Sequence, residues 1–311
     1  MQRHHICLVA VTALTIAVAA CGTTSSTPST SATAHFPVTV TGTNGTSVTI
    51  TKQPRRIVSL SPTATEMLFA INAGTEVVAV DDQSNYPASA PMTKLSGYQP
   101  NIEAIASYTP DLVVASDDTA GLVHGLGALS IPVVIETAAK NLDESYKQIQ
   151  QLGAATGRVA EATSLEKKMR TDLAAIVASI PKGTKQLKVY HELDDTYYSA
   201  TSATFIGQVY ALLGLKNIAD GAAATAGDYP QLSAEYIVAA SPDVIVLADT
   251  RCCHQSLSTV SARPGWSSIA AVKTGQVIGV DDDIASRWGP RVVDFLRALA
   301  PHVKQLEQQA A

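Results

Sequence analysis

Two arginines and a tryptophan lie just after apolar segments, where their side chains could bind an oxygen-rich ligand. Arg251 comes shortly after the apolar run DVIVLA, and Arg287 and Trp288 stand directly before a Gly-Pro pair. A guanidinium offers a planar fork of N–H donors that matches carboxylate, hydroxamate or catecholate oxygens, and an indole ring offers a stacking face. The alternative is that the arginines form surface ion pairs with the acidic run at residues 281–283.

Tyrosines and a serine at similar positions extend this candidate ligand site. A tyrosine has an apolar ring and a polar hydroxyl, so it suits the wall of a pocket or the edge of a core equally well. The further candidates for ligand binding are Ser61, Tyr86, Tyr98, Tyr197 and Tyr198.

One sequence pattern occurs twice. NIEAIASYTPDLVV starts at Asn101 and SAEYIVAASPDVIV starts at Ser233, and each places a glutamate seven residues before Pro-Asp and an apolar run. Pro-Asp suits a turn into a buried strand, and a glutamate in the first turn of a helix complements the helix dipole. The repetition predicts two related lobes, each built from the same helix, turn and strand.

The apolar segments between these sites predict an α/β fold. Helix-forming segments alternate with the short runs RRIVSL, EVVAV, DLVVAS, IPVVIE, LKVYHE, DVIVLA and GQVIGV, which is typical of parallel sheets with crossover helices. Asn44-Gly45 predicts a β-hairpin before them, and Ser61-Pro62 predicts the start of a helix. Residues 141–182 predict a long helical linker interrupted at Thr156-Gly157, and RVVDFLRALAPHV predicts the last helix.

Ligands of parallel sheets bind beyond the carboxyl ends of the strands. The expected ligand site therefore lies between the two lobes, in the loops 61–65, 81–87, 97–101, 117–119, 191–198, 249–254 and 281–288.

The cysteines exclude a framework of several disulfides. Cys7 and Cys21 belong to the N-terminal segment, so Cys252 and Cys253 remain as adjacent thiols. They can close a strained vicinal disulfide ring in an oxidising compartment, stay as inert thiols, or bind a metal with His254. Three consecutive residues rarely converge on one ion, so the first two alternatives are favoured.

Composition and motifs argue against a nucleic-acid partner and against an enzyme. The chain has 311 residues, a formal net charge of -5 and 16% charged residues, which gives no excess of basic groups for phosphates. HELDD at His191 begins like a zinc-protease motif, but its fifth residue is Asp195 instead of a second histidine. No G-x-S-x-G, C-x-x-C or P-loop motif occurs, so no catalytic residues are expected.

The N-terminus predicts export and lipidation. Basic MQRHH precedes an apolar run, residues 6–20, that is too short to span a bilayer, and VAAC ends at Cys21. Small residues before a cysteine resemble the bacterial lipobox, which implies cleavage before Cys21 and a lipid on its thiol. The expected organisation is a signal peptide at 1–20, a lipidated flexible tether at 21–35, an N-terminal lobe at 36–140, a helical linker at 141–182 and a C-terminal lobe at 183–305.

Several segments together resemble the periplasmic binding proteins for ferric siderophores, ferric citrate, haem and vitamin B12. They are PRRIVSLSPTATEMLFAINAGTEVVAV, YQPNIEAIASYTPDLVV, the mid-chain helix, PGWSSIAAVKTGQVIGVDDD and RWGPRVVDFL, and the resemblance covers about residues 36–303. It implies two lobes joined by one rigid helix, with a ligand between them that is passed to an ABC importer. It also implies that one exposed glutamate on each lobe, Glu103 and Glu235, docks onto arginines of the permease dimer.

The resemblance implies a monomeric lipoprotein on the outer face of the cytoplasmic membrane that binds a ferric siderophore or related iron chelate. Such a ligand brings its own iron ligands, so no resident cofactor and no direct bond from the protein to iron are expected. Haem, with a tyrosine or with His124, His191 or His254 reaching the iron, and cobalamin are the alternative ligands. A non-transport envelope adaptor is the alternative function.

The resemblance has one departure that bears on the ligand. Hydroxamate-type relatives often carry an arginine shortly before the Pro-Asn-Leu-Glu motif, whereas here Tyr98-Gln99 precedes Pro100-Asn101. The identity of the chelate therefore stays open.

Overall fold

A computed structural model of the chain describes residues 35–222 and 227–309. The expected signal peptide, the lipidation site at Cys21 and all of the expected tether except residue 35 lie outside the described residues. The described residues belong to one compact unit. They contain no helix that is long and apolar enough to cross a membrane.

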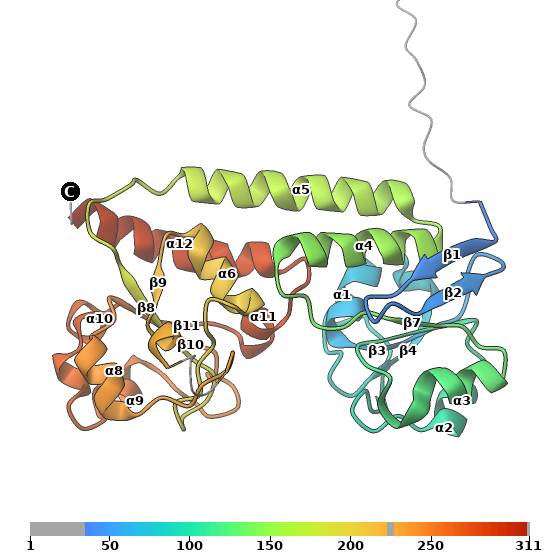
Figure 1. The fold of residues 1–311 in the computed structure, drawn as a ribbon, viewed down its shortest axis with the longest axis horizontal. Coiled ribbons are helices and arrows are strands. Elements are labelled where there is room, and N and C mark those ends of the chain that lie inside the picture. The colour runs from blue at the N-terminus through green and yellow to red at the C-terminus, as the bar shows by residue number, and fades with distance from the viewer. Residues whose placement is uncertain (1–34, 223–226, 310–311) are drawn as a thin grey trace, which may run out of the picture. The chain divides into compact units, whose positions relative to one another are not determined.

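The N-terminal half consists of a hairpin followed by a five-stranded parallel sheet (Figure 1). In the hairpin, β1 pairs antiparallel with β2 across a loop that holds Asn44 and Gly45, as the sequence predicts. The sheet has the strand order β5-β4-β3-β6-β7. The strands are β1 (Val38–Thr41), β2 (Ser47–Ile50), β3 (Ile57–Leu60), β4 (Val77–Asp81), β5 (Met92–Leu95), β6 (Leu112–Ala115) and β7 (Val133–Ile135), and the helices are α1 (Pro62–Ala70), α2 (Ile102–Ala106) and α3 (Leu122–Ala128).

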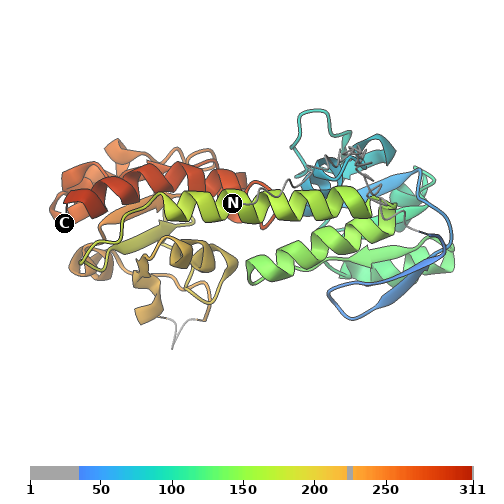
Figure 2. The ribbon, with the colours of Figure 1, turned by 90° about the horizontal axis from the view of Figure 1, so that it is seen from above.

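Two helices connect this sheet with the second one. α4 (Leu142–Thr156) begins at the N-cap Asn141, whose side chain accepts a hydrogen bond from the Glu144 N–H, and it ends at Gly157. Gly157 has φ 77°, a left-handed conformation that favours glycine, so the chain turns here as predicted. α5 (Val159–Ala178) then packs against α4 and against the C-terminal helix α12 (Figures 1 and 2).

The C-terminal half contains a four-stranded parallel sheet with the order β11-β10-β8-β9. Its strands are β8 (Lys188–Glu192), β9 (Lys216–Asn217), β10 (Val244–Leu247) and β11 (Val277–Gly279), and its helices are α6 (Phe205–Leu212), α8 (Ala234–Ala240), α9 (Leu257–Ser261), α10 (Ala270–Thr274), α11 (Asp282–Ser286) and α12 (Val292–Gln309). Short 3₁₀ turns are η1 (Gly74–Glu76), η2 (Thr119–Gly121), η3 (Ile218–Gly221) and η4 (Trp266–Ser268). The two parallel sheets and the preceding hairpin confirm the predicted α/β class.

The repeated Pro-Asp pattern has the same structural role in both halves. The Asp111 carboxylate accepts hydrogen bonds of 2.8–3.0 Å from the backbone N–H groups of Arg55 and Arg56, just before β3. The Asp243 carboxylate accepts one of 2.9 Å from the N–H of Lys188, at the start of β8. Each aspartate therefore satisfies backbone donors where the neighbouring central strand begins, which explains why the chain contains the pattern twice.

The core continues from one sheet to the other through the connecting helices. One buried cluster joins Val80 and Leu112 of the first sheet with Ile149 of α4, Met169 of α5 and Leu296 of α12. A second cluster covers the opposite face of the five-stranded sheet, and a third covers the opposite face of the four-stranded sheet around Trp266. The helices α4, α5 and α12 are thus packed into a core that belongs to both halves.

Candidate functional site

A cavity of about 590 Å³ lies at the carboxyl ends of the strands of the five-stranded sheet. This is the edge at which parallel sheets bind ligands, and the volume is in the range of small-molecule sites. The loops that follow β3, β4, β5, β6 and β7 contribute most of the lining, and the end of α11 with the loop after it contributes the rest. The lining residues are Leu60, Ser61, Pro62, Thr63, Asp81, Gln83, Gly97, Tyr98, Ser116, Asp117, Thr119, Thr137, Ala138, Asp283, Ser286, Arg287 and Trp288.

Ser61 forms part of the floor of this cavity and caps α1. Its hydroxyl accepts a hydrogen bond of 3.3 Å from the N–H of Ala64, and Pro62 opens the helix as the sequence predicts. The hydroxyl of Thr65 lies 2.8 Å from that of Ser59 and 3.0 Å from that of Ser84. This hydroxyl chain fixes the start of α1 against the loop after β4.

Asp81 places a buried carboxyl group at the wall of the cavity. The residue is 2% exposed, and its Oδ1 has no hydrogen-bond partner among the described residues. Burial raises its pKa, and a hydrogen bond with Ser84 opposes that rise. A side chain at Gly97 would meet the carbonyl oxygen of Leu60 at 2.6 Å and Oδ2 of Asp81 at 3.0 Å, so glycine is required here to keep this wall open.

Glu136 is a second buried acid at this edge, directly before the lining residues Thr137 and Ala138. It is 1% exposed, and neither carboxyl oxygen has a hydrogen-bond partner among the described residues. Burial raises its pKa to about 8, although the positive charge of Lys147 acts in the opposite direction. Glu136 is therefore mostly protonated at neutral pH.

Glu136→Gln should raise the melting temperature at pH 8 by several degrees, and the gain should vanish near pH 4.5. The folded protein retains a proton on Glu136 up to about pH 8, whereas the unfolded carboxyl group releases it near 4.5. The unfolded state thus binds fewer protons in this window, so the stability of the parent falls as pH rises. Thermal melts between pH 4.5 and 8.5 check this. Glu103→Gln, at an exposed carboxyl, is the control, and the same pH trend in both variants would contradict the assignment.

Arg287 and Trp288 reach the cavity, as the sequence predicts, but their polar groups are bound by the protein itself. Arg287 is 8% exposed, and its two terminal nitrogens donate to Glu66 at 2.8 Å, to Asp283 at 2.8 Å and to the carbonyl of Gln83 at 2.9 Å. The indole N–H of Trp288 donates to the side chain of Gln148 at 2.7 Å. The guanidinium fork of Arg287 is therefore occupied.

Glu66 holds a second arginine as well, and this links the two halves of the molecule. Its carboxylate accepts a hydrogen bond of 3.0 Å from Nε of Arg291, and the side chain of Glu66 is only 2% exposed. Glu66 lies on α1, whereas Arg287 and Arg291 both lie in the segment between α11 and the start of α12. A buried carboxylate of the N-terminal half thus pairs with two guanidinium groups of the C-terminal half.

Arg251 and three of the tyrosines do not line this cavity. The Arg251 side chain is 57% exposed and pairs with Asp283 at 2.9 Å and with Asp281 at 3.5 Å, which is the surface ion pair weighed as the alternative in the sequence. Tyr86 lies under the guanidinium of Arg291. Tyr197 packs against Trp266, and Tyr198 is 41% exposed and bridges to Gln231. Among the four predicted tyrosines, Tyr98 alone lines the cavity, and it is 80% exposed.

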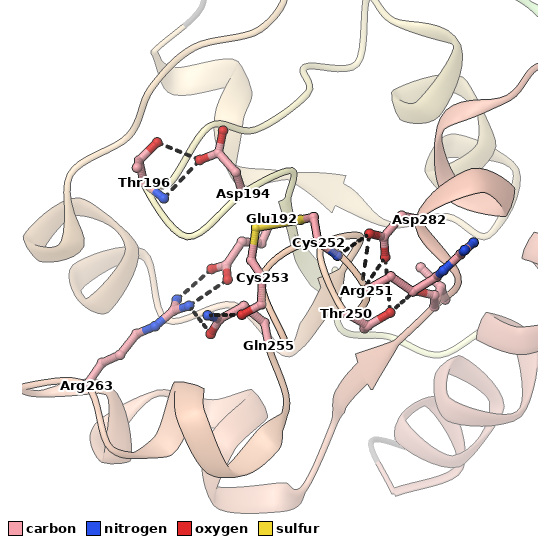
Figure 3. The surroundings of a disulfide bond; sticks show 11 residues. Glu192, Asp194, Thr196, Thr250, Arg251, Cys252, Cys253, Gln255, Arg263 and Asp282 are labelled. Atoms are coloured by element: carbon pink, nitrogen blue, oxygen red, sulfur yellow. Dashed lines mark hydrogen bonds and ion pairs between the residues drawn. A yellow bond between two sulfur atoms is a disulfide. The ribbon is translucent and has the colours of Figure 1, made fainter. Parts of the chain in front are cut away.

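Cys252 and Cys253 are joined as a vicinal disulfide in the loop after β10 (Figure 3). The Asp282 carboxylate anchors this loop by accepting hydrogen bonds from the backbone N–H groups of Arg251 and Cys252. Next to the ring, Arg263 forms two hydrogen bonds of 2.6 Å with the buried carboxylate of Glu192. Among the described residues, no group of three histidine, cysteine or acidic side chains could hold a metal ion.

Glu103 and Glu235 occupy matching positions in the two halves. Each lies in the first turn of a short helix, α2 or α8, whose N-cap residue is Asn101 or Ser233. Both glutamates are exposed. Neither carboxylate forms an ion pair or hydrogen bond with another described residue, so both are available to a partner.

Glu136 and Glu66 lie outside the site residues and loops expected from the sequence, and Asp81 falls in the expected loop 81–87 without being singled out. Asp81 and Glu136 each come directly after an apolar run, Asp81 as the last residue of β4 and Glu136 just after β7. An acid directly after an apolar strand is the sequence pattern that indicates such a site residue. Glu66 gives no such signal, because it lies within the helical segment TATEMLFAI and its partners come 221 and 225 positions later.

Comparison with known proteins identifies the class. Residues 57–284 match the periplasmic binding protein family, and the chain belongs to this family. It is 33% identical to an uncharacterized ABC transporter substrate-binding lipoprotein of Bacillus subtilis, YvrC, over 86% of each chain. It is 32% identical to a cobalamin-binding protein of Halobacterium salinarum over 85% of this chain and 73% of that protein.

A solved structure agrees with these relatives. A protein of Staphylococcus epidermidis, described as a possible iron-binding periplasmic solute-binding protein, is 26% identical and superposes with a TM-score of 0.70 over 81% of this chain and 99% of that one. The chain is thus a substrate-binding protein of the ABC transporter type. Proteins of this class bind small molecules and work with permeases.

Proposed function

We propose that this protein captures a corrinoid such as cobalamin in the cavity at the edge of the five-stranded sheet and delivers it to an ABC permease. The observation that carries this choice is the pairing of Arg287 with Glu66 and Asp283, because an occupied guanidinium fork offers little to an anionic chelate. The cobalamin-binding relative of Halobacterium salinarum supports the same choice.

The chemistry of the lining suits the edge of a corrin ring. That edge carries carboxamide groups, whose N–H donors match carboxyl oxygens and hydroxyl groups, and Asp81 and Thr137 present such acceptors at the cavity. The exposed ring of Tyr98 offers an apolar face beside them.

A ferric chelate, the ligand expected from the sequence, is the second candidate. The similarity to the possible iron-binding protein of Staphylococcus epidermidis supports it. The acids that line the cavity restrict this candidate to complexes that are neutral or positively charged. With either ligand, we propose that the metal arrives inside the ligand and that no protein side chain bonds to it.

Titration of the purified protein with four ligands tests the proposal. Isothermal calorimetry should show that cyanocobalamin binds with a Kd of about 1 μM or lower, corresponding to about -8 kcal/mol. Ferric citrate, ferrioxamine and haem should bind at least tenfold more weakly. Cyanocobalamin should also change the tryptophan fluorescence, because Trp288 lies at the cavity and the only other tryptophan, Trp266, is fully buried. Tighter binding of one of the other three ligands would reject the corrinoid assignment.

We further propose that a lipid on Cys21 keeps the protein at the outer face of the cytoplasmic membrane, as a monomer beside its permease. The lipobox-like VAAC and the lipoprotein relative of Bacillus subtilis support this. Cys21→Ala should move the protein from the membrane fraction to the soluble fraction after a salt wash. If the protein is instead an adaptor without a role in transport, it should purify from membranes without an ABC permease.

A further inference from the structure

The described lining of the cavity carries more negative than positive charge. Three aspartates, Asp81, Asp117 and Asp283, lie in it together with one cationic side chain, Arg287. Arg287 offsets only Asp283, because it pairs with that residue and with the buried Glu66, so Asp81 and Asp117 have no cationic partner among the described lining residues. A ligand in this cavity therefore meets an excess of carboxyl groups.

The three aspartates differ in what else they bind. Asp283 accepts hydrogen bonds from Asn85, Arg251 and Arg287 at 2.7–2.9 Å. Asp117 is exposed and accepts a hydrogen bond of 2.7 Å from the N–H of Asp118. Asp81 lines the cavity although it is only 2% exposed, and its Oδ1 has no hydrogen-bond partner among the described residues. A buried polar atom in that situation is costly unless a ligand satisfies it.

The backbone packs closely around Asp81 at the wall of the cavity. Gly97 lies over it, and any side chain at that position would come within 2.6 Å of the Leu60 carbonyl and 3.0 Å of Asp81 Oδ2. The backbone N–H of Ser84 donates to the carbonyl of Asp81, which fixes the start of the loop. The carboxyl group itself is hydrogen-bonded with Ser84 and with the backbone of the same loop, so it is held in place before a ligand arrives.

We propose that Asp81 contacts the ligand directly and sets its charge class, so that the cavity selects ligands that are uncharged or cationic and carry N–H donors, and rejects polyanionic ones. A carboxylate accepts hydrogen bonds from amide or ammonium groups, whereas it repels a ligand carboxylate or phenolate close to it. The proposal deepens the proposed function, on whose site it rests.

The test compares two corrinoids that differ in one group. Cyanocobalamin has carboxamides around its ring, and its monocarboxylic acid derivatives replace one of them with a carboxylate. The parent protein should bind cyanocobalamin at least tenfold more tightly than it binds the weakest-binding of these derivatives. Asp81→Asn keeps the shape and removes the charge, so it should reduce this ratio to threefold or less.

Matched variants separate a local effect from a general one. Asp82→Asn makes the same change one residue away, at an exposed side chain outside the cavity, and should leave the ratio unchanged. Asp117→Asn alters an exposed lining acid without disturbing the core and should reduce the ratio by a smaller factor. A ratio that stays the same in Asp81→Asn would overturn the proposal, as would equal reduction in all three variants.

A second pair of probes keeps charge selection distinct from the corrinoid assignment. Ferrioxamine B carries a free ammonium group, whereas the ferric citrate complex is anionic. If the protein binds ferrioxamine B and no corrinoid, the corrinoid assignment fails, and the same variants then test charge selection on this pair. Preference of the parent for ferric citrate over ferrioxamine B would overturn charge selection itself.

Discussion

Glu103→Ala combined with Glu235→Ala should abolish ligand uptake by cells, while the purified variant binds ligand with the affinity of the parent. Both carboxylates are exposed, lie in the first turns of α2 and α8, and pair with no other described residue. Their loss therefore costs the fold little, whereas a docking interface depends on a few charged contacts. Transport of labelled ligand and calorimetry on the purified protein measure the two effects separately.

The control for this experiment removes two surface carboxylates elsewhere. Asp143→Ala with Asp294→Ala changes the net charge by the same amount on α4 and α12, and uptake should persist. Normal uptake by the double glutamate variant would reject the docking role. Loss of ligand binding in that variant would show instead that the glutamates shape the ligand site.

Glu66→Gln should lower the free energy of unfolding by about 3–5 kcal/mol, because it breaks a buried ion pair and leaves guanidinium charge uncompensated. The Glu66 side chain is 2% exposed, and its partners Arg287 and Arg291 are 8% and 13% exposed. The pair joins α1 to the segment around the start of α12, so the loss should appear as lower stability of the whole molecule. Urea unfolding followed by circular dichroism measures it.

An exposed ion pair on α12 serves as the comparison. Asp294 pairs with Arg297 three residues later, and both side chains are at least half exposed. Asp294→Asn should cost less than about 1 kcal/mol. Similar losses for Glu66→Gln and Asp294→Asn would mean that the buried pair is not an important link between the halves.

Most strands and helices could be predicted because their signals are local. Ser61-Pro62 opens α1, Gly157 ends α4, and the apolar runs lie in β3, β4, β6, β8 and β10. The strands β5 and β9 were missed. β9 has two residues, and β5, with the sequence MTKL, forms only because β4 lies beside it, so neither has a pattern of its own. The last helix runs to Gln309, beyond the predicted end at Val303, with Pro301 inside it.

The site was predicted less completely than the fold because its chemistry depends on distant pairings. The strand-end rule placed Arg287, Trp288, Ser61 and Tyr98 at the cavity. It could not show that Arg287 is already paired, because Glu66 is 221 positions away in the chain. The sequence indicates which side chains lie near the end of a strand. Whether their hydrogen-bonding groups are already paired depends on the tertiary contacts.

The length of helix α5 helps to set the spacing of the two halves for any partner that docks onto both. Its 20 residues span about 30 Å, and packing against α4 and α12 prevents that length from flexing freely. Each inserted residue would shift one half by about 1.5 Å and rotate it by about 100° relative to the other. A partner that contacts Glu103 and Glu235 at the same time therefore also depends on the length of α5. Binding proteins that share one permease must then keep this helix at the same length, even where the residues that contact their ligands differ.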